Sequence, residues 1–508
     1  MKYVSTRDKS APVSAAEAIL TGVAPDGGLY VPEIIPEVDM QLMSNREHSY
    51  FPQVVETIIK MFIPEWSEAD ISALVGDTYA EDQFGDHPAG VEQLNPYIER
   101  EYLLRLDQGP TGSYKDYALR LLPGLVRQAA KSLNRESQWL LLAVTSGNTG
   151  NAALKTMADS SDLALMVFFP RGGLTPLQVA QMVYLTGPNS YVSASPLTFD
   201  QLQAELRECL TDQELREVLQ SHDVGLTTAN SLNFARLIPQ IAIYFHAYGQ
   251  LLRQDKLIPG ETVNLVIPAG NFGNALAAWY AAQMGLPVNR LILATNRNRA
   301  LLDIVKHGRV RPSRKANHTM TPGMDVLMPA NIERLLYAVA SPPTKYAEFF
   351  EAGKDFQLDK KDLKTIGDIF SVGAIDEEPT SRAIRRIYDQ TDYLVDPHTA
   401  AGMDIYERYQ NQTKDETKTL FVSVASPLRY VRTCGVSLFG ERASQALSDA
   451  ELTEKLAIEA GLEDELAKWQ GEEKGVLPEL SAGNMQRTIL EQLGVYHAEP
   501  EAVAEAEA

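Results

Sequence analysis

The most informative stretch of this sequence is Val263-Asn264-Leu265-Val266-Ile267-Pro268-Ala269-Gly270-Asn271-Phe272-Gly273-Asn274-Ala275-Leu276-Ala277-Ala278-Trp279-Tyr280. Its first five residues are almost all apolar, which is typical of a strand that is buried on both faces of a sheet. A glycine-rich turn over residues 270–274 then leads into a predicted helix. Because a strand followed directly by a helix is the repeating unit of α/β proteins, this stretch predicts an α/β fold.

The sequence on both sides repeats this alternation of strand and helix. Strands are predicted at 139–144, 163–169, 263–267 and 291–294, and helices at 148–158 and 274–284. This order favours a largely parallel sheet. The run from Leu420 to Val424 is apolar except for Ser423, so we expect it to be a strand inside that sheet.

The two ends of the chain differ from this pattern. Near the N-terminus, residues 25–32 predict a turn and a short strand, and the pattern from Val54 to Met61 predicts a helix. The polar stretch 82–90 is expected to separate this small unit from the rest. From Ala443 onward the chain is helix-prone and increasingly acidic, and residues 499–508 are expected to form a frayed, solvated tail.

Composition excludes several classes of protein. A chain of 508 residues exceeds the roughly 250–300 residues at which a single core stops growing, so two or more folded units are expected. The net charge of -21, with no basic run to offset it, disfavours nucleic acid as a partner. An anionic substrate must therefore be met by local cations and backbone amides. Cys209 and Cys434 provide neither a disulfide framework nor paired metal ligands, and they are expected to be buried small apolar residues in a reducing compartment.

No signal for membrane insertion or export is present. Residues 1–8 lack the apolar core of a signal peptide, and the sequence contains no run of about 18 apolar residues. The sequence therefore predicts a cytoplasmic protein with no membrane partner.

The turn at 270–274 has the features of an anion-binding site. Free backbone N–H groups at a helix N-terminus point at one spot, and the helix dipole favours a negative charge there. Gly270 and Gly273 permit positive φ angles and the close approach of a ligand. A tight connection with Asn274 as the helix N-cap explains the same residues. The Walker A and Gly-x-Gly-x-x-Gly patterns are both missing from this turn, which disfavours ATP and NAD.

Lys115 is the strongest candidate for a catalytic side chain. It follows Gly109-Pro110-Thr111-Gly112-Ser113-Tyr114, at the predicted start of a helix that runs on through Leu122. A lysine that is partly withdrawn from water is suited to form an imine with an aldehyde. A solvated lysine on a helix face is the alternative interpretation.

Two further polar segments have a similar character. Residues 145–151 place hydroxyls and amides at a helix N-terminus, where they can bind a carboxylate or a phenolic oxygen or can simply cap the helix. Asn230, Asn233 and Arg236 stand at helical spacing on one predicted face. Such a face can bind a phosphate in a bidentate manner, although a solvated helix face is the ordinary interpretation.

Taken in chain order, these segments resemble threonine synthase, a family of pyridoxal-phosphate (PLP) enzymes with the tryptophan-synthase β-like fold. The matching segments are 3–7, 25–29, 109–116, 145–150, 175–178, 229–233, 270–274, 294–298, 324–326, 396–400 and 425–427. The resemblance implies PLP fold type II, with two α/β domains that hold the cofactor between them. It implies an N-terminal domain over 1–95, a PLP-binding region over 96–440 with a smaller subdomain at about 136–224, and a helical C-terminal segment over 441–508.

The resemblance also implies roles for individual residues. Lys115 corresponds to the lysine that forms the Schiff base, the 270–274 loop to the phosphate cradle, and Asn148 to the residue near the phenolic oxygen. The implied cofactor-binding residues are Lys115, Asn148, Gly270, Asn271, Phe272, Gly273, Asn274, Val424 and Ser426. The implied substrate-binding residues are Thr111, Ser146, Gly147, Thr149, Gly150, Asn230, Ser231 and Arg236. No metal is implied.

The implied reaction converts O-phospho-L-homoserine and water to L-threonine and phosphate, by γ-elimination and β-addition, in a monomer or homodimer. Another PLP-dependent phospho-lyase or dehydratase, which acts on a phosphorylated or hydroxylated amino acid, needs the same lysine and cradle. A ligand-binding protein that has kept the fold without the activity is a third possibility, which the intact Lys115 and glycine-rich loop make weaker.

Several positions depart from the family pattern. Val424 stands where the family has a threonine whose hydroxyl meets the pyridine nitrogen, and valine cannot make that hydrogen bond. If the strand continues regularly, Ser423 faces away and Ser426 is placed to reach the ring. The other departures are Asn148 for an aspartate, Asn151 for a lysine, Gln108 for a histidine and Arg429 for a lysine. Loss of a cation near the 145–151 turn is expected to loosen phosphate binding.

Overall fold

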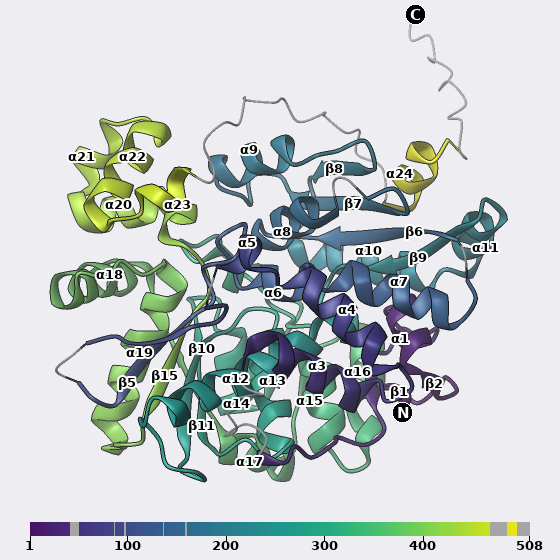
Figure 1. Cartoon of the computed structure of the whole chain (residues 1–508), viewed down its shortest axis with the longest axis horizontal. Coiled ribbons are helices and arrows are strands. Elements are labelled where there is room, and N and C mark those ends of the chain that lie inside the picture. Colours follow the sequence, from purple (N-terminus) through teal and green to yellow (C-terminus); the bar gives the residue numbers. More distant parts are fainter. Residues whose placement is uncertain are drawn as a thin grey trace, which may run out of the picture.

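A six-stranded sheet and a four-stranded sheet form the frame of the molecule (Figure 1). These sheets belong to the computed structural model of the chain, which describes residues 1–40, 50–85, 87–95, 98–135, 137–157, 160–467 and 485–494. In the view of Figure 1 the four-stranded sheet lies in the upper part of the molecule and the six-stranded sheet in the lower part. The α/β fold predicted from the sequence is confirmed.

The larger sheet has the strand order β14-β11-β10-β15-β5-β4. Its strands are β4 (Val91–Gln93), β5 (Glu101–Arg105), β10 (Val263–Pro268), β11 (Val288–Thr295), β14 (Phe370–Ala374) and β15 (Thr419–Ser423). All neighbours are parallel except β4, which is antiparallel to β5. Strand β15 lies between β10 and β5, so the prediction of an internal strand here is confirmed.

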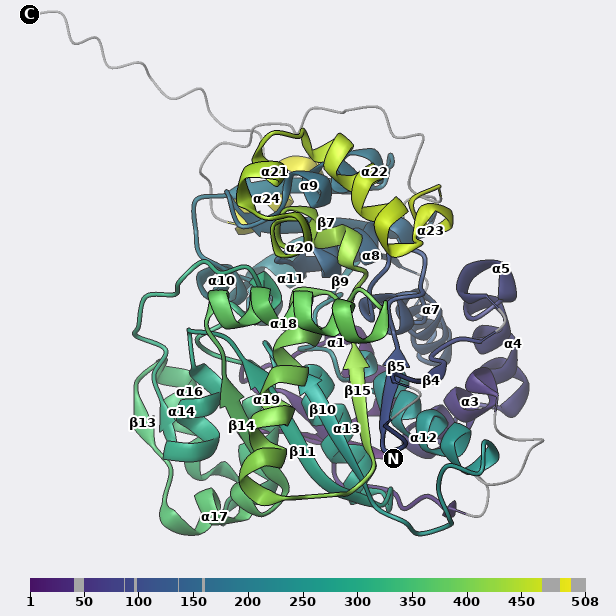
Figure 2. The same cartoon turned by 90° about the vertical axis from the view of Figure 1, so that its left-hand side faces the viewer.

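Helices cover both faces of the larger sheet, and its central strands are therefore buried on both sides. Every residue of β10 is buried, as its apolar sequence predicts. Helix α19 (Pro397–Thr413) lies along one face, with α18 (Glu377–Thr391) beside it (Figure 2). On the other face, α13 (Gly273–Gln283) packs against α12 (Ile238–Arg253), which is followed outward by α3 (Phe51–Phe62).

The smaller sheet is wholly parallel, with the order β8-β7-β6-β9. It comprises β6 (Gln138–Val144), β7 (Leu163–Pro170), β8 (Ser190–Ser195) and β9 (Val224–Thr228). Alternate residues of β6 belong to different clusters: Leu141 and Ala143 pack with α8 (Asn148–Met157), while Leu140 and Leu142 pack with α10 (Phe199–Thr211). This two-residue alternation is what a strand between two helical layers requires.

The remaining elements surround these two sheets. A small antiparallel sheet near the N-terminus, in the order β2-β1-β3, comprises β1 (Lys2–Ser5), β2 (Val13–Ser14) and β3 (Tyr30–Pro32). The other helices up to residue 221 are α1 (Ala15–Thr21), α4 (Glu68–Thr78), α5 (Glu81–Phe84), α6 (Lys115–Leu119), α7 (Leu122–Ser132), α9 (Pro176–Tyr184) and α11 (Gln213–Ser221).

The later part of the chain adds a β-ribbon and further helices. The ribbon pairs β12 (Arg309–Val310) with β13 (Phe356–Gln357). The helices are α14 (Ala300–His307), α15 (Ile332–Val339), α16 (Ala347–Ala352), α17 (Lys360–Ile369), α20 (Val431–Phe439), α21 (Glu441–Gln445), α22 (Asp449–Ala460), α23 (Glu463–Ala467) and α24 (Met485–Gln492). The predicted acidic tail at 499–508 lies outside the described residues.

The structure corrects one expectation about the bounds of a helix. The helix that begins at Lys115 ends at Leu119, and α7 begins as a separate helix at Leu122. Strands β4 and β5, which lie on either side of residue 95, pair in one sheet, and the smaller sheet ends with β9 at Thr228. The domain limits at 1–95, 96–440, about 136–224 and 441–508 stay proposals.

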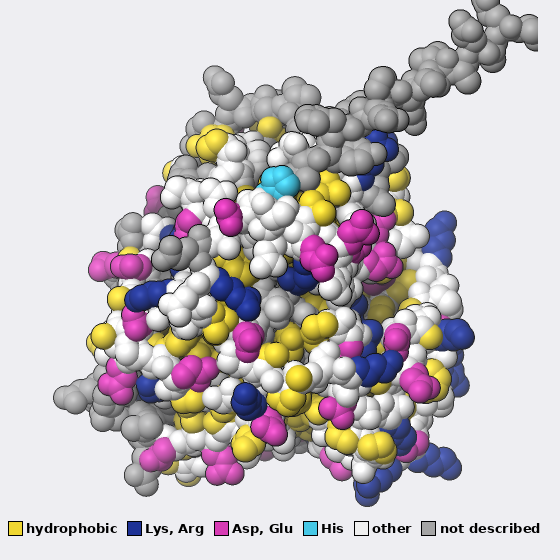
Figure 3. Space-filling view, turned by 90° about the vertical axis from the view of Figure 1, so that its right-hand side faces the viewer, with side chains coloured by type: hydrophobic (Ala, Val, Ile, Leu, Met, Phe, Trp, Pro, Cys, Tyr) yellow, Lys and Arg dark blue, Asp and Glu magenta, His cyan; other side chains and the backbone are white. Residues whose placement is uncertain are grey.

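The surface carries charged side chains of both signs (Figure 3), and the two cysteines are buried. On the face shown in Figure 3, acidic and basic side chains are interspersed with apolar ones. Cys209 and Cys434 are both free and buried, as expected. None of the described helices combines the length and the apolar character needed to cross a membrane.

Candidate active site

A cavity lies between the two sheets, where several parallel strands end. Pro268 and Ala269 at the end of β10, Val144 at the end of β6 and Val424 just after β15 all line it. Ligands of open α/β sheets bind at the carboxyl ends of the strands, because the backbone opens there into loops and helix N-termini. The position of this cavity is therefore the one expected for a functional site.

Lys115 lies in this cavity as the first residue of α6. Its Nζ donates to the Tyr114 hydroxyl at 2.5 Å. Asp116 holds the loop that precedes α6. Its carboxylate accepts hydrogen bonds from the N–H (2.9 Å) and the hydroxyl (2.7 Å) of Thr111. Burial raises the pKa of Asp116, although these hydrogen bonds act against that rise. The carboxylate thus fixes the direction in which α6 presents Lys115.

The glycine-rich loop forms another wall of the cavity, which residues 270–275 all line. Helix α13 begins at Gly273 with Phe272 as its N-cap, so the expectation of an Asn274 N-cap is wrong. The positive φ angle falls on Phe272 (63°) rather than on either glycine. Gly270 is required for a different reason: a Cβ there would lie 1.9 Å from the carbonyl oxygen of Gly323.

The backbone of this loop is available to a ligand. Among the described residues, the N–H groups of 271–275 donate to no protein acceptor. Because these groups stand at the N-terminus of a helix of 11 residues, the helix dipole adds a partial positive charge at the same spot. The loop is therefore suited to bind an anion, as the sequence predicts.

Unpaired side-chain atoms, two nitrogen donors and one amide oxygen acceptor, add to the polar character of this cavity. Arg236 Nε, Gln240 Oε1 and Asn274 Nδ2 are buried, belong to residues that line the cavity, and have no hydrogen-bond partner among the described residues. Buried polar groups are rarely left unpaired, because each costs about 1–3 kcal/mol. Burial lowers the pKa of Arg236 to about 10, which leaves the guanidinium charged at neutral pH. These atoms are the strongest indication of a polar ligand.

The segment that carries Arg236 differs from its predicted form. Residues 229–233 form bends and turns, and Phe234–Arg236 form a 3-10 helix, so Asn230, Asn233 and Arg236 do not share a solvated helix face. Asn230 lines the cavity, but its amide bonds to the N–H (2.7 Å) and C=O (2.8 Å) of Val144. Asn233 donates to Ile19 O at 2.8 Å. Arg236 alone of the three keeps an unpaired donor in the cavity.

The wall near α8 is made of polar groups that are already paired. Asn148 donates to the Tyr430 hydroxyl at 3.0 Å and accepts from Arg429 Nε at 2.8 Å and Gln178 Nε2 at 3.1 Å. Arg429 is 1% exposed and also donates to Thr111 O and to Gln181 Oε1 (3.2 Å). This cation therefore links α8 to the Lys115 segment and does not line the cavity.

The segment after β15 supports Lys115 through the backbone. Ser113 and Ala425 form an isolated antiparallel bridge, the Tyr114 N–H donates to Val424 O at 3.0 Å, and the Ser426 N–H donates to Gly112 O at 2.9 Å. The Val424 side chain lines the cavity and offers no hydrogen bond there. Replacement of this segment would therefore disturb the backbone that positions Lys115.

Four residues expected in the site do not line the cavity. The regular strand ends at Ser423, and the Ser426 hydroxyl caps the following 3-10 turn by accepting from the Leu428 N–H at 3.2 Å. Thr111 bonds to Asp116, as described above. Gly147 packs against Gln178, and Gly150 packs against Met182 and Thr145. The expected residues that do line it are Lys115, Ser146, Asn148, Thr149, Asn230, Ser231, Arg236, Gly270, Asn271, Phe272, Gly273, Asn274 and Val424.

Sequence reasoning missed several residues of the cavity, notably Tyr114, Gln240, His398 and Tyr430. His398 Nδ1 lies 2.8 Å from Asp396 Oδ1, and its Nε2 accepts from the Gly323 N–H at 3.1 Å. These bonds select the tautomer with the proton on Nδ1. The segment 396–400 was one of the matching motifs, so its histidine was the available signal.

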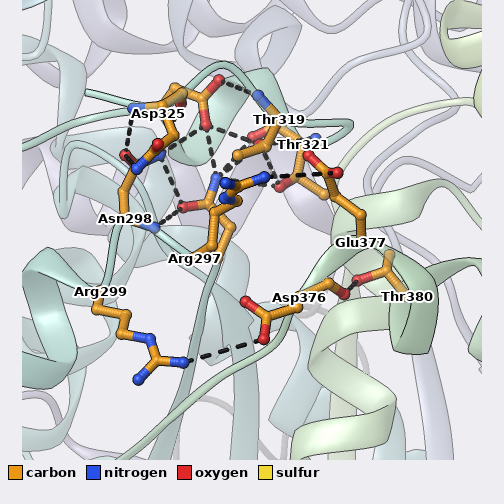
Figure 4. A network of polar contacts seen from close by, with 11 residues as sticks. Arg297, Asn298, Arg299, Thr319, Thr321, Asp325, Asp376, Glu377 and Thr380 are labelled. Carbon is orange, nitrogen blue, oxygen red and sulfur yellow. Dashed lines mark hydrogen bonds and ion pairs between the residues drawn. The ribbon is translucent and has the colours of Figure 1, made fainter. Parts of the chain in front are cut away.

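A polar network surrounds Asp325, which lies between the cavity-lining residues Met324 and Val326 (Figure 4). Asp325 accepts from Asn298 Nδ2 at 3.0 Å and from the hydroxyl (2.7 Å) and N–H (2.9 Å) of Thr319. At the edge of this network, Arg297 and Glu377 lie 3.7 Å apart. The network fixes the loop that brings Gly323, Met324 and Val326 to the cavity.

Comparisons with known proteins identify relatives of the chain. The family model described as threonine synthase N terminus matches residues 2–79. The threonine synthase of Saccharomyces cerevisiae is 30% identical over 466 residues, which cover 86% of this chain and 89% of that protein. The threonine synthase of Corynebacterium glutamicum is also 30% identical, over 87% of this chain and 91% of that protein.

Solved structures give the same result for the fold. The crystal structure of yeast threonine synthase has a TM-score of 0.76 and 28% identity, and covers 92% of this chain and 99% of its own. The PLP-bound threonine synthase of Brucella melitensis has a TM-score of 0.75 and 26% identity, over 91% of this chain and 99% of that one. The fold is accordingly that of PLP fold type II. By sequence and by fold, the chain belongs to the threonine synthase family.

Proposed function

We propose that this chain is a PLP-dependent lyase that converts O-phospho-L-homoserine and water to L-threonine and phosphate. Membership of the threonine synthase family supports the reaction. The PLP bound in the Brucella melitensis relative supports the cofactor. The observation that carries the proposal is that Lys115 shares one cavity with the free amides of 271–275 and with the unpaired Nε of Arg236.

The residues of the cavity fit this cofactor. PLP has an aldehyde, for which Lys115 is the amine, and a phosphate, for which residues 270–275 offer backbone donors. Asn148 is suited to lie beside the phenolic oxygen, with its orientation set by Tyr430, Arg429 and Gln178. When bound, PLP supplies an electron-poor ring that stabilises negative charge at the α-carbon of an amino acid.

The chain's own residues then have distinct tasks. Lys115 Nζ removes a proton from the α-carbon and returns protons as the reaction proceeds. Arg236 binds the substrate phosphate, with Ser146 and Thr149 near the carboxylate, because these are the cations and hydroxyls that the cavity offers. The lining by Phe199, Met324 and Val326 limits the access of bulk water to these groups.

A product assay tests this proposal directly. Purified protein loaded with PLP is incubated with O-phosphohomoserine, and phosphate and threonine are measured together. Equal amounts of both are expected. Borohydride reduction followed by peptide mapping should place the cofactor on Lys115; its attachment to another lysine would contradict the assignment, and Lys115→Ala provides the control.

A second candidate is a PLP-dependent phospho-lyase that eliminates phosphate without adding water at the β-carbon. The Val424 side chain favours it, because an apolar group at that wall leaves the ring nitrogen without a side-chain partner there. This enzyme would release phosphate, a 2-oxo acid and ammonia in place of threonine, with water consumed when the imine of the eliminated product is hydrolysed, so the same assay separates the two. The cytoplasmic location and the monomeric or homodimeric state stay predictions.

A further inference from the structure

The closest side-chain contact of Lys115 is with its own neighbour in the sequence. Lys115 Nζ lies 2.5 Å from the Tyr114 hydroxyl and 4.3 Å from the centre of the Tyr114 ring. Both side chains line the cavity. Adjacent residues on a helix do not normally face each other, so the lysine must fold back over the ring to make this contact.

The backbone explains why the two side chains converge. Tyr114 is the residue before α6, and its N–H donates to Val424 O at 3.0 Å. The bridge between Ser113 and Ala425 fixes the segment one residue earlier. The backbone of Tyr114 is therefore held by the segment that follows β15, through bonds in which Lys115 takes no part.

Among the described residues, Tyr114 is the only hydrogen-bond partner of Lys115 Nζ. A hydroxyl carries both a donor and acceptor lone pairs. It can donate its hydrogen to the lone pair of a neutral amine and can accept a hydrogen from an ammonium group. Reversal of this hydrogen bond moves only hydrogens, so Nζ keeps its place when its charge changes.

Tyr114 lines the same cavity as Arg236 and Asn274. Tyr244 donates to Asn274 Oδ1 at 2.7 Å. Tyr114 thus shares one cavity with the amine of Lys115 and with the groups proposed to bind anions.

We propose that Tyr114 is a catalytic residue whose hydroxyl holds Lys115 Nζ in place both as a neutral amine and as an ammonium group. The inference rests on the proposed function, because it gives Tyr114 a role in the steps that change the charge of Lys115. Phenylalanine at position 114 would keep the ring beneath the lysine and remove only the hydroxyl.

Tyr114→Phe in the full chain tests the proposal by two measurements. In the protein stripped of PLP, the rate at which acetic anhydride labels Lys115 is followed by mass spectrometry. The labelling rate should rise about tenfold, because the lone pair of the neutral amine no longer accepts a hydrogen bond from the Tyr114 hydroxyl. In the PLP-loaded protein, kcat should fall about tenfold to hundredfold, with KM changed less than about threefold.

Tyr244→Phe is the matched control for labelling, since it removes a buried hydroxyl nearby that does not contact Lys115. Unchanged labelling in Tyr114→Phe, or unchanged kcat with faster labelling, would overturn the proposal. A thermal unfolding curve like that of the wild type shows that the variant is folded. If the wild type formed no threonine or phosphate, the proposed function would fail, whereas the labelling would still decide whether Tyr114 holds Lys115.

Discussion

Arg236 and Arg429 are equally buried, each 1% exposed, but they differ in what they bind. Arg429 donates to Asn148, Thr111 and Gln181, and so joins segments that are far apart in the sequence. Arg236 makes one hydrogen bond to the described protein, with Ala229 O, and its Nε faces the cavity unpaired. Burial lowers the pKa of both side chains. Arg429 therefore stabilises the fold through its paired contacts, whereas the unpaired Nε of Arg236 leaves a donor for a ligand.

Replacement of Arg236 should have the largest effect on activity. For Arg236→Gln we expect kcat/KM to fall at least about a hundredfold, or about 3 kcal/mol, because the substrate phosphate loses its buried cation. The free energy of unfolding should change by less than about 1 kcal/mol, since the guanidinium makes only one hydrogen bond in the protein. Steady-state kinetics and urea unfolding measure the two quantities. A variant that loses stability but keeps its kcat/KM would mean that Arg236 stabilises the fold and does not bind the substrate phosphate.

The matched replacement of Arg429 should show the opposite pattern. Arg429→Gln is expected to lower the free energy of unfolding by about 3 kcal/mol, because it leaves a buried network without its cation. Material that stays folded should keep its KM within about threefold. The same urea titration and kinetics test this. Equal stability of the variant and the wild type would mean that pairing does not distinguish the two arginines.

Gln240→Glu sharpens the comparison by changing the charge of the wall next to Arg236. Gln240 donates to Arg236 O at 2.5 Å, and its Oε1 is unpaired in the cavity. A carboxylate there competes with phosphate for the guanidinium and repels it directly. Inhibition by inorganic phosphate should weaken about tenfold, which corresponds to about 1.4 kcal/mol. Gln240→Met, which removes the amide without adding charge, is the control and should weaken inhibition less.

The fold was predictable from the sequence where the pattern was local. The apolar runs at 139–144, 263–267 and 420–424 predicted β6, β10 and β15, since a strand buried on both faces leaves a continuous apolar signature. The glycine-rich loop between β10 and α13 was predictable for the same reason. Its φ angles were not, because the strain fell on Phe272 and the close approach of Gly323 to Gly270 comes from distant packing.

Residues of the cavity were predictable where a side chain of suitable chemistry belonged to a recognisable motif. The prediction failed where a local hydrogen bond turned the side chain to another partner. Thr111 and Ser426 have hydroxyls, but one bonds to Asp116 and the other caps a turn. Gln240 and Tyr430 carried no motif of their own, and only the fold brings them to the cavity. The number of unpaired polar atoms in a cavity is a tertiary property that no single segment encodes.

Asp415 extends the comparison to a paired cluster far from the cavity. Burial acts to raise its pKa, but hydrogen bonds from Thr417, Tyr409 and Asn264 outweigh it and lower the pKa from 3.8 to about 2. Its stabilisation is therefore present above pH 3.8 and is lost as the pH falls toward 2. Asp415→Asn should lower the free energy of unfolding at pH 7 by about 1 kcal/mol, after allowance for partial exposure, and should flatten its decline below pH 4. Urea unfolding at several pH values measures this, and kcat/KM at pH 7 should not change.

Val424→Thr has the smallest expected effect and tests the part of the cavity wall that Val424 forms. The change adds a hydroxyl without altering the backbone bonds of residue 424 to Tyr114 and Thr399. If the pyridine nitrogen lies at this wall, the new hydroxyl becomes its partner, the absorption spectrum of the bound cofactor shifts, and kcat rises about threefold. Val424→Ala is the control, since it changes size without adding a hydrogen bond. The Ser426 hydroxyl already accepts from the Leu428 N–H. An unchanged spectrum in Val424→Thr would therefore mean that the ring nitrogen lies elsewhere in the cavity or is hydrogen-bonded to water.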